Sequence, residues 1–242
     1  MEILGEVWRR ATSTQPAPGS GLVVSLALVA LVLVAHPRLW PLTRVLVTIT
    51  HEGGHAVAAL LVGRRLRGIR LHSDTSGLTV SYGRPTGPGM VATLLAGYLG
   101  PALVGLGSVA LLLSGHALGL LWLVLLLLAA MLLQIRNLYG FAVTVLLGAA
   151  LFALTWYGSA PTQTGVATLL TWLLLLAAPK PVAELLRQHR SGRAEHSDAS
   201  QLARLTRLPV VGWIILFGLL NLTGLLTGTA LLVPALADLF TS

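Results

Sequence analysis

Residues 45–62 read VLVTITHEGGHAVAALLV, an apolar stretch of nearly membrane-spanning length with the pattern His-Glu-x-x-His at its centre. On an α-helix, positions i and i+4 share one face, so His51 and His55 can bind one zinc ion together. Glu52 follows the first histidine and is placed to take a proton from a metal-bound water. The stretch therefore predicts a zinc centre within a membrane helix, with His51 and His55 as ligands and Glu52 as general base.

The composition supports a membrane setting. Hydrophobic residues make up 55% of the chain and charged residues 10%, which leaves too few polar side chains to cover a water-soluble globule. The chain has no cysteine, so metal ligands must come from His, Asp and Glu. The net charge is +8, but the basic residues flank apolar segments and mark topology, so we expect no nucleic-acid partner.

Seven apolar segments approach the length of about 20 residues that a spanning helix needs. We predict an all-α polytopic membrane protein with about seven transmembrane helices, forming a single integral-membrane domain over residues 1–242. Within it, residues 1–20 are a cytoplasmic tail and residues 179–208 a cytoplasmic loop. The predicted spans are 21–35, 42–62, 89–114, 117–134, 138–157, 162–178 and 209–236.

The basic residues are unevenly divided between the two predicted sides of the membrane. With a cytoplasmic N-terminus, only Arg38 and Arg44 of the 16 basic residues fall outside. The positive-inside rule therefore favours that orientation, in which the motif helix runs from outside to inside. His51 and His55 then lie near mid-membrane, where hydrolysis requires a polar cavity that admits water.

The segment 68–83 departs from the helical pattern. Two runs that alternate apolar and polar residues, 69–72 and 78–82, surround a polar turn, which is typical of a short β-hairpin on the cytoplasmic side. Its free edge offers Leu78 and Val80 for pairing with an extended substrate peptide. A hairpin that only fills a loop accounts for the pattern equally well.

Four arginines lie within residues 64–70, just before and inside this hairpin. A basic cluster beside a membrane helix is typical of a loop anchored to anionic lipid headgroups. We favour that interpretation over a role in substrate binding.

A catalytic zinc site usually has three protein ligands, so one is missing from the motif helix. Asp198 is the first choice, because it lies in the predicted cytoplasmic loop shortly before the last span. The alternative is that Ser197 or Asp198 only caps a helix over 199–207. Asp74 in the hairpin turn is the second choice, although an Asx-type turn is the more favoured interpretation there.

Other polar and small residues point to contacts between helices. Asn137, at the inner end of the fourth predicted span, either binds substrate backbone or bonds to a neighbouring helix. Gly53 and Gly54 permit close approach to the zinc-binding face, and the glycines within 97–101 permit tight packing of their own helix. We expect the helix that contains 97–101, kinked by Pro101, to pack beside the motif helix.

Together these features resemble the site-2 protease family of zinc intramembrane metallopeptidases, and more narrowly its compact bacterial branch without a PDZ domain. The resemblance covers roughly residues 45–215. It implies that His51, His55 and an aspartate bind Zn²⁺ and that Glu52 is the general base. The motifs that carry it are His-Glu-Gly-Gly-His at 51–55, Gly-Tyr-Leu-Gly-Pro at 97–101, Arg-Asn at 136–137 and Ser-Asp-Ala at 197–199, of which the first is specific and the others are supportive.

One family element has no counterpart in this chain. The usual Asn-Pro-x-x-x-x-Leu-Asp-Gly segment would supply the aspartate ligand, yet no aspartate occurs between Asp74 and Asp198. Asn137 stands at about the position of its asparagine. Either Asp198 supplies the ligand from the following cytoplasmic segment, or the protein binds zinc weakly or not at all.

The sequence thus leads to two functional hypotheses. The first is a zinc metalloendopeptidase of the site-2 protease type, cleaving a peptide bond in or near a transmembrane segment of a protein substrate. The second is a non-proteolytic membrane scaffold that retains the fold. Both place the protein in a lipid bilayer, with the bacterial inner membrane the expected one, and neither fixes an oligomeric state.

Overall fold

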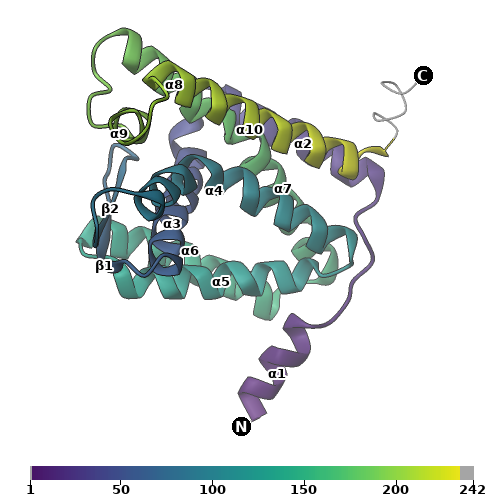
Figure 1. Ribbon diagram of the computed structural model, residues 1–242. Coiled ribbons are helices and arrows are strands. Elements are labelled where there is room, and N and C mark those ends of the chain that lie inside the picture. The colour runs from purple at the N-terminus through teal and green to yellow at the C-terminus, as the bar shows by residue number, and fades with distance from the viewer. Residues whose placement is uncertain (1, 235–242) are drawn as a thin grey trace.

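The fold is a bundle of helices with one small sheet at its end (Figure 1). The computed structural model describes residues 2–234, so the last two residues of the span predicted at 209–236 lie outside the described residues. The elements in chain order are α1 (Glu2–Ala11), α2 (Ser20–Ala35), α3 (Trp40–Leu61), β1 (Arg65–Leu71), β2 (Gly77–Tyr82), α4 (Pro88–Leu113), α5 (Ala117–Gln134), α6 (Leu138–Tyr157), α7 (Ala160–Ala177), α8 (Pro179–Arg190), α9 (Asp198–Leu205) and α10 (Val210–Leu232).

Five helical stretches are long and apolar enough to cross a membrane: α4, α5, α6, the continuous stretch of α7 and α8, and α10. A sixth span is possible if α2 and α3 count as one bent unit, because they meet at an angle of 98°. A mostly helical membrane protein with a short hairpin is therefore confirmed. The count of seven spans stays a prediction, because α2 has only 16 residues and α3 turns sharply away from it.

The bend between α2 and α3 follows from local sequence. Residues 36–39 form a turn, and Pro41 stands in the first turn of α3, where its missing N–H costs no helical hydrogen bond. Two contacts hold the bend against α8. Lys180 donates to the carbonyl of Val34, and its ammonium group lies 4.2 Å from the centre of the Trp40 ring.

The amino-terminal segment lies at the end of the bundle opposite the hairpin. The backbone N–H of Gln15 donates to Gly115 O at 2.7 Å, and its amide donates to Gln163 Oε1 at 2.9 Å. Residues 2–20 therefore lie beside the turns after α4 and α6, away from the hairpin with which the prediction grouped them. The side of the membrane on which they lie stays a prediction. Conversely Arg44, predicted on the opposite side, forms an ion pair with Glu184 of α8 at 3.2 Å.

The predicted hairpin is confirmed as an antiparallel pair in which Arg65 lies opposite Tyr82 and Leu71 opposite Gly77. The outer edge of β1 is occupied, because Ile69 bridges to Ile135 and the N–H of Arg136 donates to Ile69 O at 2.9 Å. Within residues 2–234, no strand pairs with the outer edge of β2. The β1 edge of the hairpin is thus fixed to the bundle, and the β2 edge is without a paired strand among the described residues.

Two large apolar cores hold these parts in place, together with a smaller one that joins β1 to α3 and α5 through Ile69, Leu71 and Met131. The larger lies between α2, α4, α5 and α7 and contains the fully buried Val109, Leu121 and Leu175. A second core joins α8 and α9 to α10 and includes Leu202 and Phe217. The predicted cytoplasmic loop 179–208 is therefore largely ordered into two packed helices, of which α9 begins at Asp198.

Candidate metal centre

Three side chains from two distant parts of the chain converge beside the hairpin. His51 Nε2 and His55 Nε2 lie 3.1 Å apart, and each lies 3.3 Å from Asp198 Oδ2. Donor atoms of a tetrahedral zinc ion at about 2.0–2.1 Å from the metal are about 3.3–3.4 Å apart. These three residues thus have the identity and the spacing of a three-ligand zinc site, and they form one potential metal-binding group.

The hydrogen bonds of His55 fix which ring nitrogen faces the other two residues. Its Nδ1 lies 2.7 Å from the backbone oxygen of Thr93, and because a carbonyl only accepts, Nδ1 carries the proton. In the neutral ring Nε2 is then an unprotonated acceptor, directed at the carboxylate of Asp198. Two acceptors at this distance repel each other unless a proton or a metal cation lies between them, and this donor set fits a metal.

Close packing of α4 against α3 limits the space around the histidine rings. A Cβ on Gly97 would overlap the rings of His55 and His51, and a Cβ on Gly100 would lie 2.5 Å from Thr50 O. Gly54 likewise touches the backbone of Ala96. The expected packing of the 97–101 helix beside the motif helix is confirmed, and the glycines are what allows it.

Asp198 is presented by the first turn of α9. Ser197 is the N-cap and accepts from the N–H of Ser200 at 3.3 Å, while the hydroxyl of Ser200 donates to Ala194 O at 2.7 Å. Ser197 thus caps the helix, and its neighbour Asp198 belongs to the potential metal-binding group. Burial opposes ionisation of Asp198, and when no metal is bound, positive charge on the protonated rings of His55 and His51 holds the pKa of the Asp198 carboxyl well below its usual range.

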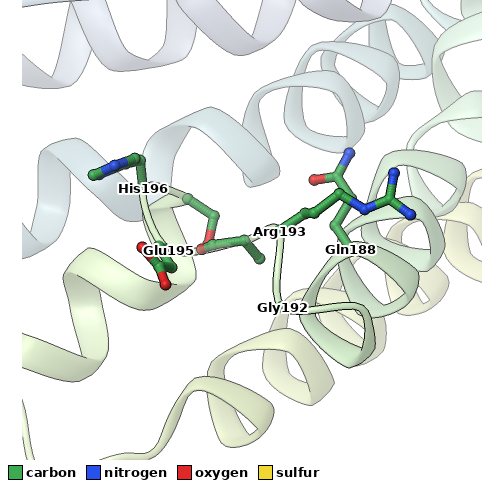
Figure 2. Close-up of a pocket in the computed structure, with 7 residues that line it drawn as sticks. Gln188, Gly192, Arg193, Glu195 and His196 are labelled. Atoms are coloured by element: carbon green, nitrogen blue, oxygen red, sulfur yellow. The ribbon is translucent and has the colours of Figure 1, made fainter.

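The loop before α9 is tied to the same helix. Arg204 donates to Glu195 O and Gln201 to His196 O, both at 3.1 Å. An open depression of about 490 Å³ lies along this loop; Figure 2 shows Glu195 and His196 on one side of it and Arg193 with Gln188 on the other. None of the residues that line the depression belongs to the metal-binding group. The visible role of the loop is to carry Asp198 at the start of α9.

Glu52 lies on α3 against the hairpin and is 4% exposed. The hydroxyl of Thr79 donates to Glu52 Oε2 at 2.6 Å, and a Cβ on Gly77 would lie 2.6 Å from Glu52 Oε1. The carboxylate of Glu52, the predicted general base, is therefore held by β2. A side chain at position 77 would have to displace this carboxylate.

The remaining predicted site residues lie in the hairpin or support it. Asn137 forms two hydrogen bonds with the backbone of Leu71, donating to its oxygen at 2.6 Å and accepting from its N–H at 3.2 Å. Leu78 is 50% exposed and Val80 is partly buried. Contact of Asn137, Leu78 and Val80 with substrate stays a prediction. Asp74 forms an Asx turn, accepting from the N–H of Ser76 at 2.9 Å, and is not part of the ligand group.

Sequence reasoning missed three residues that support the site. Thr79 donates to Glu52, Thr93 orients His55, and the Tyr98 ring lies edge-on to His51 with ring centres 4.8 Å apart. Strand alternation places Thr79 on the face opposite Leu78 and Val80, which is a usable signal. No local pattern marks Thr93, because only its backbone oxygen is used.

Comparison with known protein families adds an independent result. A family model described as Peptidase M50B-like matches residues 24–228, most of the chain. The chain belongs to this family, which is the site-2 protease family. No PDZ domain is detected, as expected for the compact branch. The family match extends beyond the predicted region 45–215 at both ends. No curated protein and no solved structure matches the chain.

Proposed function

We propose that this Peptidase M50B-like protein is a zinc-dependent intramembrane endopeptidase that hydrolyses a peptide bond in or near a transmembrane segment of its substrate. The observation that carries the proposal is the position of Asp198, which completes a ligand triangle with His51 and His55. When bound by these residues, zinc supplies the Lewis acidity that acidifies a water molecule and polarises the scissile carbonyl.

The chain's own residues perform the proton transfers. Glu52 accepts the proton of the attacking water on its carboxylate and passes it to the leaving amine. Thr79 fixes one carboxylate oxygen by donating a hydrogen bond to Oε2, so the side chain stays in one rotamer. Because Glu52 is buried, bulk water does not compete for that oxygen.

The hairpin provides a means of presenting substrate. A peptide bond inside a helix is inaccessible, so the substrate must be extended before cleavage. The outer edge of β2 offers backbone groups for an added strand, and Leu78 and Val80 flank the Thr79 that bonds to the base. Asn137 supports this function by fastening Leu71 of the partner strand, and we propose that it also contacts substrate.

Glu52→Gln tests the mechanism. It preserves side-chain size and all three metal ligands but removes the base, so we expect near-normal zinc content and cleavage reduced by about 10²–10⁴-fold. The assay uses purified protein and a panel of single-span model membrane proteins. Glu6→Gln, at the far end of the bundle, is the matched control and should cleave normally.

The outcomes separate the two hypotheses. Undiminished cleavage by Glu52→Gln contradicts the assignment of the base. If both proteins hold zinc and neither cleaves any member of the panel, the non-proteolytic scaffold replaces the peptidase. Fractionation of bacterial cells that express the chain tests the proposed inner-membrane location.

A further inference from the structure

A second polar contact joins the motif helix to the part of the chain that carries Asp198. The indole N–H of Trp40 on α3 donates to Glu184 Oε1 of α8 at 2.9 Å, and the guanidinium of Arg44 lies 3.2 Å from Glu184 Oε2. The ammonium group of Lys180, one turn before Glu184, lies 4.2 Å from the centre of the Trp40 ring. We call Trp40, Arg44, Lys180 and Glu184 the clasp; none of them belongs to the metal-binding group.

The clasp holds Glu184 in one orientation. Each oxygen of its carboxylate has a different donor, so rotation of the side chain would break both contacts. The side chains of Glu184 and Arg44 are 21% and 32% exposed, and a partly buried pair is screened less by solvent than an exposed one. The contact between α3 and α8 is therefore directional.

The clasp and the metal ligands occupy the same face of α3. At about 100° per residue, positions 40, 44, 51 and 55 lie within about 60° of one another around the helix axis. Arg44 and His51 are seven residues apart, which corresponds to about 10 Å along the axis. One face of α3 thus offers two polar contact points, about two turns apart.

Both contact points meet a single unit of structure. The helices α8 and α9 lie at the hairpin end of the bundle and are joined by a short loop (Figure 1). Leu185 of α8 and Leu202 of α9 are buried in the same apolar core, against Phe217 of α10. Because this core joins the two helices, a shift of Glu184 on α8 would move Asp198 at the start of α9.

Apolar packing alone does not set the position of this unit along α3. Among residues 2–234, no apolar core contains residues of both α3 and the unit. Both pack against α4, which contributes Leu94 to the core of the unit and Gly97 to the contact with the histidine rings. Apolar contacts are non-directional and allow small shifts, whereas the clasp has fixed partners and opposes them.

We propose that Arg44 and Glu184 are positioning residues for the third metal ligand. Their ion pair holds α8 and α9 at the position along α3 where Asp198 meets His51 and His55. Among the described residues, no ion pair joins Arg44 or Glu184 to these three side chains, so the pair acts through the placement of Asp198. The inference rests on the metal site of the proposed function but not on peptide hydrolysis.

Glu184→Gln tests the proposal, because it removes the charge and keeps an acceptor for Trp40. Zinc affinity of the purified protein is measured by competition with a chelator, and the protein loaded with Co²⁺ gives an absorption spectrum that reports the ligand geometry. We expect zinc affinity to fall about tenfold, as for other changes that misplace a ligand, and the cobalt spectrum to change. Arg44→Gln should have the same effects, and Arg44→Lys, which keeps the charge, should restore most of the affinity.

Glu195→Gln is the matched control. It removes the same charge from an exposed position only three residues before Asp198, and it should match wild type in both measurements. The double variant Arg44→Gln with Glu184→Gln should lose no more zinc affinity than either single variant, because the two residues act as one pair.

Thermal unfolding of the metal-free proteins separates positioning from stability. Variants that unfold at a lower temperature but keep the wild-type zinc affinity and cobalt spectrum overturn the proposal, because the pair would then only stabilise the fold. Additive losses in the double variant, or an equal loss in Glu195→Gln, overturn it as well. A folded wild type that binds neither metal refutes the metal site and this inference together. A wild type that binds zinc but cleaves no substrate refutes the peptidase alone, since no measurement here requires hydrolysis.

Discussion

The two ends of the bundle both bury polar side chains, but they do so in opposite ways. At the far end, Gln163 donates from Nε2 to the carbonyls of Leu154, Thr155 and Gly158, and its oxygen accepts from Gln15. The side-chain amides of Gln15 and Gln163 each meet an acceptor, and neither carries a charge. Such a cluster needs nothing further to be stable.

At the hairpin end, acceptors face acceptors. The Nε2 of His55 and Oδ2 of Asp198 lie 3.3 Å apart, and His51 completes the group. Such an arrangement is stable only with a cation or a proton between its members. The contrast distinguishes a structural polar cluster from a functional one without reference to family membership.

The largest expected effect comes from removing one member of each cluster. His55→Ala and Asp198→Ala should each lose zinc, measured by metal analysis of purified protein, and cleavage should fall below detection. Gln163→Ala should keep zinc and activity while lowering the free energy of unfolding by about 1–3 kcal/mol, because several carbonyls lose their donor. Stoichiometric zinc in Asp198→Ala would remove the ligand assignment.

A smaller effect should follow from disturbing the helix contact that shapes the metal end. Gly97→Ala places a methyl group against both histidine rings, so we expect zinc affinity to fall by about 10–100-fold, as for other changes that misplace metal ligands. Gly107→Ala is the control in the same helix, because a Cβ there meets no atom within 4 Å. Equal zinc affinity in the two variants would show that α4 does not constrain the ligands.

Removing the support of the base should cost less again. Thr79→Val deletes the hydrogen bond to Glu52 Oε2, and we expect kcat to fall about tenfold with KM and zinc content unchanged. Thr79→Ser should restore most of the rate. Thr171→Val is the matched control, since that buried hydroxyl donates only to Ala167 O of its own helix at 2.8 Å. A change in KM alone would mean that Thr79 contacts substrate and does not position the base.

Local sequence patterns were sufficient to predict the parts of the molecule whose structure depends on neighbours in the sequence. The spacing of His51 and His55, the alternation around the hairpin and the glycines of 97–101 each reflect local geometry, and each predicted its structure. Asp198 was reachable by elimination, since few carboxylates are available. The partner of Gln15 was not, because its bond with Gln163 crosses most of the chain and leaves no periodic signal.

Charge counting grouped the N-terminus with the hairpin, whereas the contacts place the two at opposite ends of the bundle. The contacts move Arg9 and Arg10 to the far end and Arg44 to the hairpin end, and Arg38 lies in the turn that precedes Arg44. On the side away from the hairpin, Arg9 and Arg10 take the place of Arg38 and Arg44. The excess of basic residues on the hairpin side is therefore the same in both arrangements. The positive-inside rule therefore still favours a cytoplasmic hairpin, and we expect residues 2–20 on the outer side.

Cysteine labelling tests this orientation with the smallest perturbation, because the chain contains no cysteine. Ala17→Cys and Ser114→Cys lie at the far end and Ser191→Cys after α8, all at exposed positions, so none should alter activity. On intact cells, a membrane-impermeant maleimide should label the first two and not the third. Labelling of Ala17→Cys together with Ser191→Cys would contradict the contacts at Gln15. Labelling of Ser191→Cys alone would instead indicate a cytoplasmic N-terminus. The metal centre would be unaffected, because the positions of His51, His55 and Asp198 do not depend on the side that the N-terminal segment occupies.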